Sequence, residues 1–326
     1  MIGIFYGTRP EYIKLVPIIS ALKERGMKYT LFQVRQHTDL LEGCDWDRQI
    51  LVEEHSKNRL NNIFASVMSE GLRELDCVIV QGDTATAVAA ALSAFNYNIP
   101  VHHVEAGLRT YDKKNPFPEE VNRRIISLVA SVHYCPTEID AGNLLDEGFR
   151  TDAILITGNT IIDNLQGRES TKGKTVVVTM HRRENQPNLK DWCEEIERLA
   201  YEHPDYDFVF LMHPSPQVQK HKGIFKTVQV IDAVDHETML DMIASCQCVI
   251  TDSGGVQEEC SFFEKRCFVC RTVTERPCPG QVLCNTPEDL YNKFSINFEL
   301  DFEGTTPFGD GHAGENIAED LQRRVR

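Results

Sequence analysis

Residues 248–265 have the pattern of an anion-binding turn between a strand and a helix. Residues 248–250 form a short apolar run typical of a buried strand, and residues 256–265 have helical spacing. The turn between them contains Ser253, Gly254 and Gly255. Glycines let an anion approach backbone N–H groups, and the helix dipole favours negative charge at the N-terminus. Glu259, about one turn into this helix, offers a carboxylate that can accept hydrogen bonds from the hydroxyls of a ribose.

The same stretch is also typical of a plain structural turn, capped by Asp252 or Ser253. Basic residues elsewhere in the chain favour a binding role. Binding residues are usually found on loops, and several arginines fall on predicted loops, namely Arg9, Arg182, Arg183, Arg271 and Arg276. We therefore keep a small anionic substrate as one hypothesis and a structural turn as the other.

Strand and helix patterns alternate along the first half of the chain. Apolar runs typical of strands occupy residues 1–6, 29–35, 77–80, 100–104, 132–135 and 153–156. Helical spacing occupies residues 11–25, 60–72, 85–95 and 138–147, with a further helix that ends at residue 130. Continuous apolar strands separated by helices predict a parallel sheet covered on both faces. Pro17 predicts a kink or tight packing in the first helix.

The alternation restarts after a polar, glycine-containing stretch at residues 166–174, which is the best candidate for a linker. Strands are predicted at residues 175–179, 207–211, 227–231, 248–250 and 267–271. Helices are predicted at residues 188–201, 236–245 and 256–265. The sequence therefore predicts two doubly wound α/β domains, which would place a ligand in the cleft between them.

Composition narrows the class of protein. A formal net charge of −15 argues against a nucleic-acid partner. No run of about 18 apolar residues is present, which predicts no membrane span. The N-terminus lacks the features of a signal peptide, so we expect a cytoplasmic protein with reduced cysteines. Cys267 and Cys270 lie three residues apart in a predicted strand, on opposite faces, which argues against a shared metal.

Eight loops share a pattern with one enzyme family. In chain order they are Gly-Thr-Arg-Pro-Glu-Tyr-Ile-Lys (7–14), Gln-Gly-Asp-Thr (81–84), His-Val-Glu-Ala-Gly-Leu-Arg (103–109), Pro-Phe-Pro-Glu-Glu-Val-Asn-Arg (116–123), Thr-Gly-Asn-Thr (157–160), His-Arg-Arg-Glu-Asn (181–185), Asp-Ser-Gly-Gly-Val-Gln-Glu-Glu (252–259) and Thr-Glu-Arg-Pro (274–277). Together they closely resemble the loops of the non-hydrolysing UDP-N-acetylglucosamine 2-epimerases, which have the GT-B fold of two Rossmann-like domains. Spacing and composition alone stop at a two-domain α/β protein with a cleft.

The resemblance implies interconversion of UDP-GlcNAc and UDP-ManNAc without a cofactor. In this family the C2 proton is removed and UDP is expelled, which leaves a 2-acetamidoglucal. UDP then adds back after C2 is protonated on its other face. The resemblance also implies a homodimer, and domains at residues 1–165 and 166–306. Residues 307–326, with a helix at 318–324, would cross back onto the first domain.

The resemblance assigns roles to individual residues. Asp83, Glu105 and Glu119 match the acid–base carboxylates of the family, and Lys14 matches a catalytic cation. Taken alone, Asp83 is equally typical of a helix cap, and the two glutamates are typical of solvated loop charges. His181, Arg9 and the turn Ser253–Gly255 would stabilise the leaving diphosphate. The remaining contacts to UDP would come from His213, Glu259, Thr274 and Arg276.

Several alternatives stay open at this point. A hydrolysing 2-epimerase would release ManNAc and UDP, and a related enzyme would act on a UDP-2,3-diacetamido uronic acid. A glycosyltransferase of the same fold would share the nucleotide-binding turn, and an inactive UDP-sugar sensor belongs to a different class. Many bacterial members bind a second UDP-GlcNAc as an activator. Gln36, His37 and Arg182 match that second site only in part, so allosteric control stays open.

Overall fold

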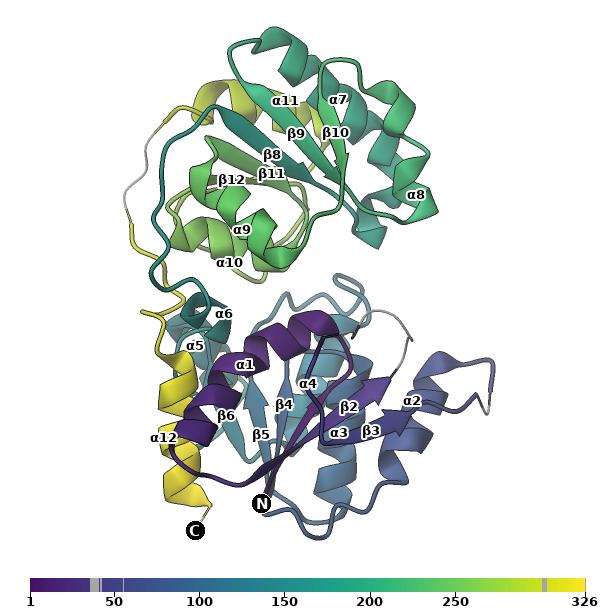
Figure 1. Ribbon diagram of the computed structural model, residues 1–326, viewed down its shortest axis with the longest axis vertical. Coiled ribbons are helices and arrows are strands. Elements are labelled where there is room, and N and C mark those ends of the chain that lie inside the picture. The colour runs from purple at the N-terminus through teal and green to yellow at the C-terminus, as the bar shows by residue number, and fades with distance from the viewer. Residues whose placement is uncertain (36–40, 42, 55, 301–303, 326) are drawn as a thin grey trace. The chain divides into compact units, whose positions relative to one another are not determined.

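The computed structural model describes residues 1–35, 41, 43–54, 56–300 and 304–325 (Figure 1). The chain divides into two compact units. Unit 1 comprises Met1–Gln166 and Pro307–Arg326, and unit 2 comprises Gly167–Thr306. Each unit contains a parallel β-sheet with helices on both faces. The doubly wound α/β architecture predicted from the sequence is therefore confirmed.

Among its described residues, unit 1 has seven parallel strands in the order β3-β2-β1-β4-β5-β6-β7. The strands are β1 (Ile2–Tyr6), β2 (Tyr29–Arg35), β3 (Arg48–Leu51), β4 (Cys77–Gln81), β5 (Val101–Val104), β6 (Val132–Cys135) and β7 (Ile154–Ile156). β3 was not predicted, because it is an edge strand in which Ile50 alone is buried. The order reverses between β1 and β4.

Alternate residues along the central strands of unit 1 enter cores on opposite faces of the sheet, as expected for extended backbone. Phe5 and Val78 pack with α2 (Arg59–Met68), α3 (Ala85–Asn96) and α4 (Glu119–Val129). Ile4 and Ile79 pack with α1 (Arg9–Glu24) and α12 (Ala313–Arg324). Shorter elements complete the unit, namely α5 (Glu138–Asp146), α6 (Thr160–Asp163) and the 3₁₀ turn Thr151–Ala153.

The C-terminal helix α12 packs along α1 (Figure 1). It begins at Ala313 rather than at the predicted residue 318, because Asp163 accepts hydrogen bonds from the N–H groups of Ala313 and Gly314 at 3.1 and 2.7 Å. α1 continues through Pro17. A Cβ atom at Gly314 would lie 2.6 Å from the Pro17 carbonyl carbon. Pro17 therefore marks tight helix packing, one of its two predicted outcomes.

Among its described residues, unit 2 has six parallel strands in the order β10-β9-β8-β11-β12-β13. The strands are β8 (Thr175–Thr179), β9 (Asp207–Met212), β10 (Gln229–Asp232), β11 (Cys248–Thr251), β12 (Arg266–Val269) and β13 (Gln281–Leu283). The helices are α7 (Leu189–Glu202), α8 (Pro216–Gln219), α9 (His236–Ser245), α10 (Gly254–Phe262) and α11 (Pro287–Asn297), with 3₁₀ turns at Arg183–Asn188 and Lys222–Ile224. Trp192, Phe210 and Phe294 anchor the core that α7 and α11 cover.

Helices α8 and α11 and strand β13 of unit 2 were not predicted, and one strand ends early. α11 starts after the cap Thr286 and buries Leu290 and Phe294 alone, which is too weak a pattern to detect. β13 is a short edge strand whose residues are all half-buried. The strand predicted at 267–271 ends at Val269, because the Arg271 N–H donates to the Val269 carbonyl at 2.9 Å and turns the chain. The described helices include none with the length and apolarity to cross a membrane.

Candidate active site

Each sheet has a topological switch point where the strand order reverses. It lies between β1 and β4 in unit 1, and between β8 and β11 in unit 2. In open α/β sheets, ligands bind beyond the carboxyl ends of the strands at such points. The turns and helix starts that follow these four strands carry Arg9, Asp83, His181 and Ser253–Gly255 respectively. The topology therefore places these predicted residues at the binding edge of each unit.

Lys14 and Glu105 form a buried ion pair in unit 1. Lys14 Nζ lies 2.7 Å from Glu105 Oε1, and the two side chains are 11% and 6% exposed. The Gln81 side chain at the end of β4 donates to Glu105 Oε2, and a Cβ atom at Gly82 would lie 3.7 Å from the same oxygen. Glu105 has a φ of +64°. Left-handed backbone costs a non-glycine residue about 1–2 kcal/mol, and such strain clusters at functional sites.

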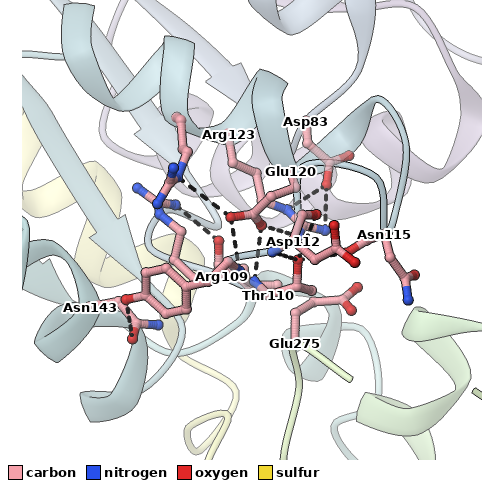
Figure 2. Close-up of polar contacts among 12 residues, drawn as sticks. Asp83, Arg109, Thr110, Asp112, Asn115, Glu120, Arg123, Asn143 and Glu275 are labelled. Carbon is pink, nitrogen blue, oxygen red and sulfur yellow. Dashed lines mark hydrogen bonds and ion pairs between the residues drawn. The ribbon is translucent and has the colours of Figure 1, made fainter. Parts of the chain in front are cut away.

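Asp83 is held by residues of α4 (Figure 2). Arg123 Nε and Nη2 both lie 2.8 Å from Asp83 Oδ2, and Asn122 Nδ2 donates to the Asp83 carbonyl at 2.7 Å. The cap of α3 is Thr84, whose Oγ1 accepts a hydrogen bond from the Ala87 N–H at 3.1 Å. The interpretation of Asp83 as a helix cap is therefore wrong.

Glu119 and Arg9 each begin a helix at this edge of unit 1. Glu119 is the first residue of α4 and is half-buried. Its Oε2 atom is buried and, within the described part of the chain, has no hydrogen-bond partner. A buried unpaired carboxylate oxygen is costly, which favours a role in contacting a ligand. Arg9 is exposed at the first position of α1.

Glu11 is a buried carboxylate that sequence reasoning missed, although it lies within the first loop motif. It is 2% exposed. Its Oε2 accepts hydrogen bonds from the Gly7 N–H at 3.0 Å and the Thr8 hydroxyl at 2.8 Å, and its Oε1 accepts one from the Thr84 hydroxyl at 2.6 Å. Glu11 therefore ties the loop after β1 to the loop after β4. Burial raises the pKa of Glu11 to about 7, against the opposing effect of these hydrogen bonds.

Glu11→Gln is expected to change how stability depends on pH. Because burial raises the pKa of Glu11 from 4.5 to about 7, the folded state binds this proton more tightly than the unfolded state. The resulting stability is fully present below pH 4.5 and is lost as pH rises through 7. The variant lacks this titration. Its unfolding free energy relative to wild type should therefore rise by about 3 kcal/mol between pH 4 and pH 8.

Denaturant unfolding at both pH values measures this shift. Glu24→Gln, at an exposed position at the end of α1, is the matched control and should show no shift. If the free energies of unfolding of Glu11→Gln and wild type differed by the same amount at both pH values, this would contradict a raised pKa at Glu11.

Asp252 joins the two loops at the switch point of unit 2. Its buried carboxylate accepts hydrogen bonds from the N–H groups of His181 at 3.1 Å and Arg182 at 2.9 Å. It also accepts one from Asn185 Nδ2 at 3.0 Å. Ser253 is the cap residue of α10, but its side chain makes no capping hydrogen bond. The interpretation of this turn as a side-chain cap is therefore wrong. Asp252 instead holds the loop after β8, which carries His181.

His181 and His213 stack on each other in unit 2. Their ring centroids lie 5.4 Å apart with an interplanar angle of 18°. His213 Nδ1 accepts a hydrogen bond from the Ser215 N–H at 3.1 Å. Partial burial, followed by the neighbouring His181, lowers the pKa of His213. The structure therefore brings the two predicted histidines of this unit together, beside the buried carboxylate of Asp252.

Two guanidinium groups lie against the first residue of α10. A Cβ atom at Gly254 would come within 2.7 Å of Arg276 Nη1 and 3.4 Å of Arg182 Nη2. Glycine therefore leaves the space that these cations occupy beside the backbone. The N–H groups of a first helical turn and the helix dipole add partial positive charge at the same place. This arrangement suits a phosphate or diphosphate group.

The first turns of α10 carry buried carboxylates with defined partners. Glu258 Oε1 accepts a hydrogen bond from Arg276 Nε at 2.7 Å. Glu259 Oε1 lies 2.8 Å from His236 Nε2, and this hydrogen bond is the main cause of a raised pKa of His236. Thr274 donates to a glutamine side chain of the same helix at 2.7 Å. Thr274 and Arg276 are thereby fixed against α10, whereas His236 is a neighbour that sequence reasoning missed.

Two further expectations concern metals and regulation. Among the described residues, no three His, Cys, Asp or Glu side chains are grouped so that they could hold a metal ion. Cys267 and Cys270 are buried free thiols. Of the residues matched to an activator site, Gln36 and His37 lie outside the described residues, and the guanidinium of Arg182 lies beside Gly254 of α10.

Comparison with known proteins identifies the family. A family model described as UDP-N-acetylglucosamine 2-epimerase matches residues 54–322. The chain belongs to this family. A UDP-N-acetylglucosamine 2-epimerase of Neisseria meningitidis is 34% identical, with 97% of each chain aligned. A putative member from Clostridium acetobutylicum is also 34% identical, over 96% of this chain and 92% of the relative.

Solved structures of the epimerase family share this fold. The Neisseria meningitidis UDP-GlcNAc 2-epimerase bound to UDP-GlcNAc is similar with a TM-score of 0.88 and 30% identity, over 99% of both chains. An S. aureus protein solved with UDP is similar with a TM-score of 0.87 and 30% identity, over 99% of this chain and 96% of the other. The epimerase resemblance and the GT-B type of fold predicted from the eight loops are therefore confirmed.

Proposed function

We propose that this chain interconverts UDP-GlcNAc and UDP-ManNAc by exchanging the proton on C2 while the nucleotide is retained. Family membership supports epimerisation of UDP-GlcNAc, and similar structures have been solved with UDP-GlcNAc or UDP. The observation that carries the proposal is the set of carboxylates Asp83, Glu105 and Glu119 on the loops and helix start that follow β4 and β5. Inversion at C2 needs positioned groups that remove and deliver a proton.

The proposed reaction is balanced without an oxidant or a reductant. A carboxylate of this set removes the C2 proton, and the C2–H electron pair forms a C1–C2 double bond. The bond between C1 and the UDP oxygen breaks, and its electrons leave with UDP. The intermediate is the 2-acetamidoglucal. Delivery of a proton to the opposite face of C2, with addition of the UDP oxygen to C1, gives UDP-ManNAc.

The departing UDP gains negative charge on its terminal phosphate. In unit 2, His181 and the turn Ser253–Gly255 would stabilise this charge, and Arg9 is the candidate cation of unit 1. The guanidinium groups of Arg276 and Arg182 support this assignment, because they lie beside Gly254, the first residue of α10. Lys14 would act in unit 1 by holding Glu105, since the two form a buried pair at 2.7 Å. His213 and Thr274 would make further contacts to UDP.

Glu259→Ala is expected to weaken UDP binding by about 10- to 100-fold, the loss typical of hydrogen bonds to a charged group. Glu259 Oε1 is occupied by His236 at 2.8 Å, so we assign Oε2 to the ribose hydroxyls. Isothermal titration calorimetry with UDP measures the effect. Glu194→Ala, on the exposed side of α7, is the control and should bind UDP normally. An unchanged UDP affinity in Glu259→Ala would refute the ribose assignment.

Phosphorus and proton NMR of the chain with UDP-GlcNAc test the proposed function. The expected result is UDP-ManNAc, with diphosphate signals of a UDP-sugar and without accumulating UDP. Free UDP and ManNAc would overturn nucleotide retention and assign a hydrolysing enzyme. Turnover of a UDP-2,3-diacetamido uronic acid, with none of UDP-GlcNAc, would overturn the substrate assignment. UDP binding without turnover of either sugar nucleotide would indicate a sensor.

A further inference from the structure

Glu120 is a completely buried carboxylate near the start of α4 that joins a loop to the guanidinium of Arg123 (Figure 2). Its Oε2 accepts a hydrogen bond from the Thr110 N–H at 3.0 Å, and its Oε1 accepts one from the Tyr111 N–H at 3.2 Å. These two residues lie in the loop after β5, which also carries Glu105. Glu120 Oε2 also lies 3.4 Å from Arg123 Nη1, one turn later on the same helix. Glu120 therefore links the loop after β5 to the guanidinium of Arg123.

Arg123 connects Glu120 to Asp83, and its own side chain is 4% exposed. Its Nε and Nη2 atoms both lie 2.8 Å from the same oxygen, Asp83 Oδ2. Both contacts are made to Oδ2, so the other carboxylate oxygen, Oδ1, is not the one that these two nitrogens hold. The Asp83 side chain is 23% exposed, whereas that of Glu120 is fully buried. In the series Glu120, Arg123 and Asp83, Glu120 is therefore enclosed by protein, whereas Asp83 is accessible at the edge of the sheet.

We propose that Glu120 and Arg123 are positioning residues that hold Asp83 by Oδ2, so that Oδ1 is the oxygen that exchanges a proton with C2 of the sugar. In this step the C2–H bond breaks and its proton passes to Oδ1. Arg123 stays protonated and transfers nothing. Glu120 fixes the plane of the guanidinium and ties it to the loop of Glu105. The inference rests on the proposed function, because it assigns Asp83 a proton-transfer role.

Two donors of one planar guanidinium converge on the same oxygen, Asp83 Oδ2, and a lysine cannot supply such a fixed pair of donors. Arg123→Lys keeps the charge and should let Asp83 rotate. Misplacement of a reacting group by about 1 Å can cost on the order of 100-fold in rate. We therefore expect kcat to fall by about 10- to 100-fold in Arg123→Lys, with KM and the Kd for UDP within about twofold of wild type.

Two further variants separate positioning from folding. Glu120→Gln keeps the shape of the side chain. It should also lower kcat with little change in KM, but by less than Arg123→Lys does. Glu147→Gln is the matched control. Glu147 pairs instead with Arg109 at 2.8 Å and with Arg124 at 3.7 Å. Its turnover should stay close to wild type. Thermal unfolding of each variant shows whether it is folded.

A double-mutant cycle with Asp83→Asn decides whether Arg123 acts through Asp83. Single-turnover incorporation of solvent deuterium at C2 measures the residual rates. If Arg123 acts through Asp83, adding Arg123→Lys to Asp83→Asn should cost less than about twofold more. Losses that multiply in the double variant would overturn the inference and leave the proposed function standing. No deuterium incorporation by the wild-type chain would overturn the proposed function and the inference with it.

Discussion

Replacing Asp83 with asparagine is expected to lower the turnover of UDP-GlcNAc by about 10²- to 10⁴-fold while UDP still binds. Asparagine has nearly the shape of aspartate, and its amide oxygen can take the place of Asp83 Oδ2 and accept the hydrogen bonds of Arg123 Nε and Nη2, which are 2.8 Å long in the wild type. An amide cannot take up a proton as a carboxylate does, so the chemical step should fail. The candidate contacts to UDP lie mostly in unit 2 and are unchanged in this variant, so the Kd for UDP should change little.

Turnover by NMR and UDP affinity by calorimetry separate the two effects. Asp146→Asn, at an exposed carboxylate at the end of α5, is the matched control and should keep wild-type turnover. Turnover of Asp83→Asn within about threefold of wild type would remove Asp83 from the chemical step, because general acid–base groups contribute far more than that. Lost UDP binding would instead point to a structural role for Asp83.

Replacing Gly107 with alanine is expected to destabilise unit 1 by about 3 kcal/mol or more. Gly107 lies in the motif that contains Glu105 and has a φ of +90°. A Cβ atom there would lie 2.2 Å from the Asp140 carbonyl oxygen, which is a backbone atom in α5 and cannot move aside cheaply. Left-handed strain costs about 1–2 kcal/mol, and overpacking typically adds about 1–3 kcal/mol. The midpoint of thermal unfolding should fall by roughly 6–12 °C.

A second glycine of the same region supplies the control. Gly142 lies inside α5, and a Cβ atom there would meet no heavy atom within 4 Å. Gly142→Ala should therefore leave stability unchanged or raise it by about 0.5–1 kcal/mol, because alanine favours the helix. Thermal unfolding followed by circular dichroism compares the two variants. A Gly107→Ala chain as stable as Gly142→Ala would contradict the close approach of the Glu105 loop to α5.

The two sheets were predictable because their central strands are continuous apolar runs. The strands at residues 29–35 and 175–179 have the bounds that the sequence predicted. The edge strands β3 and β13 were not predicted, since half-buried edges lack a clear apolar pattern. Their positions depend on hydrogen bonds to β2 and β12. Such pairing joins segments that no local window of sequence contains.

The positions of the candidate site residues were predictable to the extent that they follow apolar strands. Asp83, Glu105 and His181 all lie on loops at strand ends, and their roles stay predictions. Their partners were not predictable. The pair between Arg123 and Asp83 spans 40 residues and depends on the packing of α4 against α3. Glu120 has the pattern of a solvated charge in the sequence, and its burial arises from the backbone of the loop before α4.

Proton NMR of the enzyme with UDP-GlcNAc in deuterated water tests the central claim most directly. We expect UDP-ManNAc that carries deuterium at C2, because a proton taken by an enzyme carboxylate exchanges with solvent before a proton returns to the other face. UDP-ManNAc that keeps the original proton at C2 would contradict proton exchange by Asp83, Glu105 and Glu119. Release of free ManNAc with UDP would contradict retention of the nucleotide.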